Sequence, residues 1–216
     1  MFRGGEKMGQ KQAFVNRKLH SLLGLIPLVI FLGFHLTVNF MATKGATAYN
    51  DAAEAVGNMP LRYLLEIVVI FVPLLLHGVY GIYIAYVSKN NVSQYPTCRN
   101  WNFYIQRISG VYLFVFIVIH VWQTRVQALF GTHVDFNMME QILSSPWWFA
   151  FYVLGVLCAT YHLGNGLWLF CVSWGLTVTP KSQKVFKVIA MAAFVLLTYM
   201  GIRALLAFID PVLKTM

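Results

Sequence analysis

Four of the six histidines in this 216-residue chain lie inside long apolar stretches, where an ionisable side chain is costly and is usually kept for a function. They are His35, His77, His120 and His162, at successive separations of 42, 43 and 42 residues. A neutral imidazole can bind a metal through one ring nitrogen while the other nitrogen donates a hydrogen bond. The spacing therefore predicts one such imidazole in each of four successive membrane-spanning helices.

Because successive spanning helices reverse direction, the near-constant spacing alternates the depth of these histidines in the bilayer. At a rise of about 1.5 Å per residue, His35 and His120 lie about 8 and about 5 Å outward of their helix midpoints. The same rise puts His77 about 4 Å toward the cytoplasm and His162 within about 2 Å of the middle. Only the pairs His35–His120 and His77–His162 match in depth, with centres about 10 Å apart along the membrane normal.

Two imidazoles that face each other across a helix bundle can supply both axial ligands of a haem. A zinc site needs several ligands at one depth, and a proton relay usually has Asp or Glu at the membrane centre. The sequence offers neither. Small residues that would make room for a flat cofactor recur near the histidines, although glycines also serve helix packing in membranes; they are Gly24, Gly33, Gly78, Gly81, Gly110, Gly155, Gly164 and Gly166. The pattern favours two b-type haems over a transporter or scaffold.

The composition indicates a membrane protein. Hydrophobic residues make up 59% of the chain and charged residues only 11%, against about 25% charged in soluble domains. This excludes a disordered chain and an ordinary cytosolic enzyme, and the net charge of +9 is spread too thinly to mark a nucleic-acid surface. The three cysteines form no Cys-x-x-Cys pair, which excludes an iron–sulfur cluster and a thioether-bound haem.

Five apolar stretches are long enough to span a bilayer. We expect one all-α transmembrane domain over residues 1–216, with helices at about 19–40, 62–87, 104–129, 147–175 and 185–209 and short loops between them. Eleven of the sixteen Lys and Arg residues fall in the N-terminal arm and in the second and fourth connections, which predicts a cytoplasmic N-terminus. The first apolar run is too long for a signal-peptide core, so we expect it to be an uncleaved anchor.

Motifs around the histidines resemble those of the dihaem cytochrome b subunit in menaquinone-linked succinate dehydrogenases and fumarate reductases. The matching segments are RKLHSLLG at 17–24, HGVYG at 77–81, HVWQTR at 120–125 and HLGNGLW at 162–168. The likeness runs from about Asn16 to Phe208. It implies two b haems, the outer one bound by His35 and His120 and the inner one by His77 and His162.

The resemblance also implies two soluble partners on the cytoplasmic side of a prokaryotic cytoplasmic membrane. One is an FAD-bearing subunit that interconverts succinate and fumarate, and the other is an iron–sulfur subunit. This chain would anchor both in the lipid bilayer and exchange electrons with a quinone, here menaquinone, near the outer surface; the succinate chemistry is not on it. An alternative is the dihaem cytochrome b of another respiratory dehydrogenase, of the hydrogenase or formate dehydrogenase type.

Other polar residues are candidates for supporting roles. Glu66, about one turn into the second span from the outside, is placed for proton transfer to a quinone; a structural pair with Arg62, four residues earlier on the same helix face, explains it equally well. Groups at the cytoplasmic edge are placed for the propionates of the inner haem or for other inner-face contacts, although the ordinary preference for cations on that side explains them nearly as well; they are Arg17, His20, Ser21, Arg107 and Lys184.

Overall fold

The protein is a bundle of membrane-spanning helices. A computed structural model describes residues 3–215, with side chains from residue 9 onward. Within this part of the chain, five helices are long and apolar enough to cross a membrane. They cover Gly9–Lys44, Arg62–Val87, Cys98–Leu129, Pro146–Ser173 and Pro180–Phe208. The predicted all-α bundle with five spans is thereby confirmed.

Three of the five spans are composite. The first joins α1 (Arg3–Phe40) to a 3-10 turn, η1 (Met41–Lys44); the second joins α3 (Arg62–Leu65), a π-helical segment η2 (Glu66–Phe71) and α4 (Val72–Val87). The third joins α5 (Cys98–Val121), a second π-helical segment η3 (Trp122–Val126) and α6 (Gln127–Leu129). The fourth and fifth are the continuous helices α8 (Pro146–Ser173) and α9 (Pro180–Phe208).

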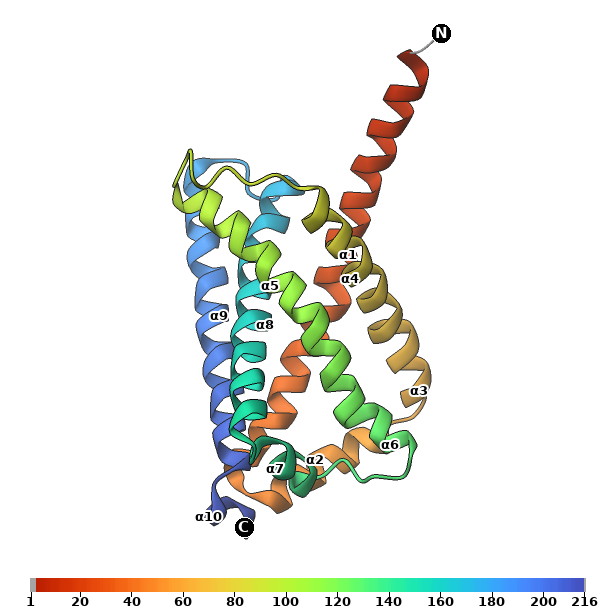
Figure 1. The fold of residues 1–216 in the computed structure, drawn as a ribbon, viewed down its shortest axis with the longest axis vertical. Coiled ribbons are helices and arrows are strands. Elements are labelled where there is room, and N and C mark those ends of the chain that lie inside the picture. Colours follow the sequence, from red (N-terminus) through yellow and green to blue (C-terminus); the bar gives the residue numbers. More distant parts are fainter. Residues whose placement is uncertain (1–2, 216) are drawn as a thin grey trace.

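The first four spans form a closed ring, and the fifth lies outside it. Around the ring α1 packs on α4, α4 on α5, α5 on α8, and α8 on α1, while α9 packs against α8 and α1 (Figure 1). Helices α1 and α5 are therefore diagonal to each other, as are α4 and α8. Any side chains that meet across the centre of the ring must come from one of these two diagonals.

Small residues allow α8 and α9 to approach closely. A Cβ atom added at Gly164 would lie 2.9 Å from the Ala190 carbonyl oxygen on α9, and one added at Gly201 would lie 2.6 Å from a methyl group of Val156. The hydroxyls of Thr160 and Thr198 share a hydrogen bond of 2.7 Å across the same interface. Close backbone approach and an interhelical hydrogen bond are the means by which helices associate in lipid, where apolar surface gives no driving force.

Three helices start earlier than the sequence-based ranges, and side-chain caps rather than charge-free runs set two of these starts. Helix α1 already begins at Arg3, α5 begins at Cys98 and α9 begins at Pro180. The Thr97 hydroxyl accepts a hydrogen bond from the Asn100 backbone N–H and so caps α5. A reciprocal capping box between Thr179 and Ser182 starts α9. The apolar runs mark only the lipid-embedded part of each helix.

Short helices close the end of the bundle opposite the N-terminus. These are α2 (Ala46–Gly57), α7 (Phe136–Leu143) and α10 (Pro211–Lys214), where the sequence analysis expected only short loops (Figure 1). Phe208 of α9 is 1% exposed and contacts the rings of Tyr49 and Phe136, with centroid separations of 4.8 and 5.1 Å. The cap thus has an apolar core of its own, which anchors both connections to α9.

We expect Phe208→Ala to lower the free energy of unfolding in detergent micelles by about 3–5 kcal/mol, because it leaves a cavity in that core. Val195→Ala is the control, since Val195 lies on the same helix and is 62% exposed toward lipid. Equal stabilities of the two variants would show that the cap does not contribute to the stability of the bundle.

Candidate functional site

The four intramembrane histidines meet as two pairs, one on each diagonal of the ring. His77 of α4 and His162 of α8, here the inner pair, have ring centroids 6.2 Å apart and planes at 89°. His35 of α1 and His120 of α5, the outer pair, have centroids 5.8 Å apart and planes at 80°. These are the two pairings whose members the sequence analysis placed at matching depths in the bilayer.

The two pairs lie at different levels along the same helices. The inner pair is beside Gly24 of α1 and Gly110 of α5, since a Cβ atom at either glycine would meet the ring of His77 or His162. The outer pair lies farther along those two helices, at His35 and His120. Ten or eleven residues of helix correspond to about 15 Å along the helix axes; the sequence estimate of about 10 Å concerned only the membrane normal.

The separation of the rings fits a metal ion bound between two imidazoles. Metal–nitrogen bonds of about 2 Å on each side, plus about 1 Å from each nitrogen to its ring centroid, put the centroids about 6 Å apart. Among the residues that the structure describes, no group of three or more His, Cys, Asp or Glu side chains could hold a metal ion. Two facing imidazoles suit a cofactor that needs two axial ligands, as haem does.

Backbone carbonyls orient both imidazoles of the inner pair. Nδ1 of His77 lies 2.9 Å from the carbonyl oxygen of His20, and Nδ1 of His162 lies 3.1 Å from that of Gln106. A carbonyl only accepts, so each Nδ1 carries the proton and each Nε2 keeps a free lone pair for a metal. The His20 ring also stacks on His77, with centroids 4.1 Å apart and planes at 4°. His20, expected at the inner face, thus contacts the pair directly.

An amide cluster between α5 and α8 supports the inner pair from behind. The Gln106 Nε2 group donates to the His162 carbonyl at 3.0 Å, and the fully buried Asn165 donates to Gln106 Oε1 at 2.8 Å. Ser109, one turn from Gln106, lies 3.2 Å from His162 Nδ1. Sequence reasoning missed Gln106 and Ser109. The helical spacing of polar residues on the apolar α5 was the signal that could have revealed them.

Side chains rather than carbonyls orient His120 of the outer pair. Its Nδ1 lies 3.2 Å from the hydroxyl of Tyr152, and that hydroxyl donates to Gln123 Oε1 at 3.0 Å. The ring of Phe116 stacks on His120, with centroids 5.6 Å apart, and it occupies space that a side chain at Gly155 would fill. Near His35, the Asn39 amide lies 3.4 Å from Nε2 and donates to the His35 carbonyl at 2.8 Å.

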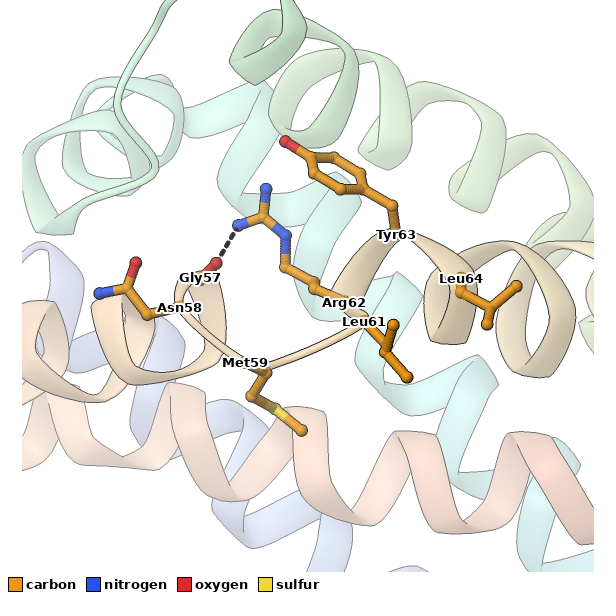
Figure 2. A pocket seen from close by; sticks show the side chains of 7 residues that line it. All are labelled: Gly57, Asn58, Met59, Leu61, Arg62, Tyr63 and Leu64. Carbon is orange, nitrogen blue, oxygen red and sulfur yellow. Dashed lines mark hydrogen bonds between the residues drawn. The ribbon is translucent and has the colours of Figure 1, made fainter.

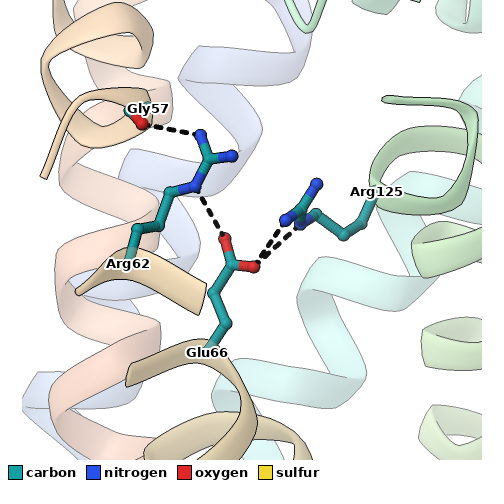
Figure 3. A network of polar contacts seen from close by, with 4 residues as sticks. All are labelled: Gly57, Arg62, Glu66 and Arg125. Atoms are coloured by element: carbon teal, nitrogen blue, oxygen red, sulfur yellow. Dashed lines mark hydrogen bonds and ion pairs between the residues drawn. The ribbon is translucent and has the colours of Figure 1, made fainter. Parts of the chain in front are cut away.

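Glu66 lies near the capped end of the bundle between two arginines (Figure 3). Its Oε2 accepts hydrogen bonds from Nε and Nη2 of Arg125, at 2.9 and 2.7 Å, whereas Arg62 Nε is 3.7 Å from Oε1. The sequence analysis had considered Arg62 alone, because a partner on another helix leaves no local pattern. Glu66 and Arg125 belong to the two π-helical segments, which occur frequently at functional sites.

A cavity of about 400 Å³ opens beside this ion pair at the start of the second span. Seven residues between Gly57 and Leu64 line it, and they include Arg62 and Tyr63, whose side chains lie next to each other in Figure 2. The Arg62 guanidinium lies over the Tyr63 ring at 4.6 Å and donates to the Gly57 carbonyl at 2.7 Å. The Arg62 guanidinium thus covers one face of the Tyr63 ring beside the cavity.

The other inner-face candidates differ in their surroundings. The Ser21 hydroxyl accepts a hydrogen bond from the Trp174 indole at 3.0 Å, and Arg107 lies over the Phe103 ring at 3.9 Å. Arg17 and Lys184 are exposed. Lys18, which the sequence analysis did not select, donates to the Ser173 carbonyl and so joins α1 to the end of α8.

The fold and site define a class: a multi-pass membrane protein whose helix ring holds two diagonal pairs of imidazoles. Residues 94–201 match the family model described as "Succinate dehydrogenase/Fumarate reductase transmembrane subunit". The chain is 49% identical to the succinate dehydrogenase cytochrome b558 subunit of Bacillus subtilis (strain 168), over 94% of this chain and all of that protein. It is 35% identical to the succinate dehydrogenase hydrophobic membrane anchor subunit of Thermoplasma acidophilum, over 31% of this chain and 53% of that protein.

The chain therefore belongs to the succinate dehydrogenase/fumarate reductase transmembrane subunit family, as a membrane anchor of the cytochrome b type. The predicted resemblance to the cytochrome b anchor of succinate dehydrogenases is thereby confirmed. The alternative, a cytochrome b of the hydrogenase or formate dehydrogenase type, gains no support from these relatives.

We expect Gly24→Ala to lower the melting temperature of the protein in detergent, because the new methyl group overlaps the His77 ring. Gly33→Ala on the same helix is the control, since a Cβ atom there meets nothing within 4 Å. Both changes gain the same helix propensity of about 1 kcal/mol, so the difference between them isolates the overlap. Equal melting temperatures would show that His77 does not need the space at Gly24.

Proposed function

We propose that this chain holds two b haems and conducts electrons between an iron–sulfur subunit and menaquinone in a succinate:quinone oxidoreductase. His77 and His162 would hold the inner haem, and His35 and His120 the outer one. The observation that carries the proposal is the meeting of four imidazoles from four helices as two diagonal pairs, each with ring centroids about 6 Å apart.

The chain orients three of the four imidazoles for this role. Hydrogen bonds at Nδ1 of His77, His120 and His162 hold the rings in the tautomer that leaves Nε2 free. A neutral imidazole binds a metal through its unprotonated ring nitrogen. A bound b haem supplies reversible one-electron transfer, and two of them at different depths would connect the two ends of the bundle.

The soluble partners, an FAD-bearing subunit and the iron–sulfur subunit, would dock at the end that carries the N-terminus. Most of the cations in the sequence are at this end, as expected for a cytoplasmic face. Helix α1 also projects beyond the other helices here (Figure 1), with exposed side chains from Gly9 to Val15. The family and its Bacillus relative support a place in the cytoplasmic membrane of a prokaryote. Arg17, Ser21, Arg107 and Lys184 remain proposals for inner-face or propionate contacts.

The quinone would react near the opposite end, close to the outer pair and Glu66. Both hydrogen bonds from Arg125 go to Oε2 of Glu66, whereas Oε1 has only the longer contact with Arg62. Oε1 is therefore the oxygen with room to hold a proton. Quinone reduction consumes two electrons and two protons, and a positioned carboxyl group can deliver one of the protons. The adjacent cavity, lined in part by Arg62 and Tyr63, would be the place for the quinone ring.

We expect His35→Ala or His120→Ala to abolish the outer haem and His77→Ala or His162→Ala to abolish the inner one, because haem with one axial ligand removed no longer gives a low-spin centre. Reduced-minus-oxidised spectra and haem content per purified complex measure the loss. His133→Ala, in an exposed loop, is the control. A variant at any of the four positions that kept both low-spin spectra would remove that histidine from the ligand set.

We expect Glu66→Gln to slow quinone turnover about 100-fold, within the range of general acid–base contributions, while both haems stay bound. Glu140→Gln is the matched control, because Glu140 is similarly exposed and is paired with Lys214 outside the spans. Wild-type turnover in Glu66→Gln would assign Glu66 to the ion pair with Arg125 alone.

A further inference from the structure

Tyr152 occupies a position that the haem ligands alone do not explain. It lies on α8, the helix that supplies a ligand to the inner pair, yet its hydroxyl contacts His120 of the outer pair. The side chain is 3% exposed and packs among Phe116 and Phe151 in an apolar cluster. A phenol buried in this way needs hydrogen-bond partners for its hydroxyl group.

The direction of the hydrogen bonds follows from the groups present. The Tyr152 hydroxyl has one proton, and it donates that proton to Gln123 Oε1 at 3.0 Å. Towards His120, the phenol oxygen therefore acts as the acceptor, and His120 Nδ1 must carry the donated proton. We call these two hydrogen bonds, from His120 Nδ1–H to Tyr152 and from Tyr152 to Gln123, the outer relay. In each of them the donor is the group nearer to the imidazole.

These two hydrogen bonds affect the donor strength of the His120 ring as well as its orientation. An acceptor at Nδ1–H increases the basicity of the other ring nitrogen, and neighbouring hydrogen bonds polarise one another. In the inner pair, His77 Nδ1 has the His20 carbonyl as acceptor and His162 Nδ1 has the Gln106 carbonyl, with the Ser109 hydroxyl also within 3.2 Å of His162 Nδ1. No side-chain substitution removes the two carbonyls. The outer relay consists of two side chains, so an amino-acid substitution at either position can change it.

We propose that Tyr152 and Gln123 are positioning residues that set the tautomer and the donor strength of His120, and so lower the midpoint potential of the outer haem. The inference rests on the proposed function, since it assumes that His120 is an axial ligand. A more basic ligand stabilises the oxidised iron, which is the reason for the sign. Gln123 belongs to η3, the π-helical segment that also presents Arg125 to Glu66.

The test is a redox titration of the purified complex carrying Tyr152→Phe. Phenylalanine fills the same space, so we expect both haems to remain bound, the potential of the outer haem to rise and that of the inner haem to stay unchanged. Tyr112→Phe is the matched control: its hydroxyl donates to the Phe151 carbonyl at 2.9 Å and its ring stacks on the same Phe116. This control should leave both potentials unchanged.

Gln123→Leu provides an independent second variant, because it removes the end of the relay and leaves the Tyr152 ring in place. We expect a smaller rise of the same potential. If Tyr152→Phe does not assemble, Gln123→Leu decides: an unchanged outer potential overturns the inference.

Two further results would also overturn it: an unchanged outer potential in Tyr152→Phe with both haems bound, or an equal shift in Tyr112→Phe. A wild-type complex with fewer than two low-spin haems would instead refute the proposed function on which the inference rests.

Discussion

Three of the four imidazoles inside the apolar bundle have an acceptor at Nδ1 on a neighbouring helix, and much of the structure follows from these hydrogen bonds. Water is absent from the hydrocarbon core, so the acceptor must come from the protein. His77 of α4 finds it on α1, His162 of α8 finds it on α5, and His120 of α5 finds it on α8. Each of these hydrogen bonds crosses between neighbouring helices of the ring. The bonds that orient the imidazoles therefore also join the helices that carry them.

Packing repeats this arrangement at both levels of the bundle. In each pair one imidazole stacks on an aromatic ring: His77 on His20, and His120 on Phe116. In each stack one ring lies against a glycine, His77 against Gly24 and Phe116 against Gly155. A flat ring packed tightly between neighbours has few rotamers available. The glycines allow the helices to approach closely enough for this packing, and the packing fixes the plane of the imidazole.

The two ends of the bundle differ in kind. Near the N-terminal end, backbone carbonyls and a buried amide cluster hold the inner pair, in regular α-helix. Near the capped end, side chains hold His120, and both neighbouring spans change to π-helix where they present Glu66 and Arg125. A π-helical turn shifts the register of the side chains that follow it, which lets distant residues converge. Among the described residues, both π-helical segments thus lie at the end where the quinone chemistry is proposed.

Apolar run length and histidine spacing by themselves determined the all-α class, the five spans and the identity of the two pairs. The rise of a helix per residue and the reversal of direction between successive spans depend only on position along the chain, so they can be read from the sequence. The motifs also led to the family. Only the tertiary structure decided four other features. They are the relay through Tyr152 and Gln123, the pairing of Glu66 with Arg125, the amide cluster around Gln106, and the capping helices α2 and α7. Each depends on the rotation of one helix against another, which no local pattern records and which packing alone sets.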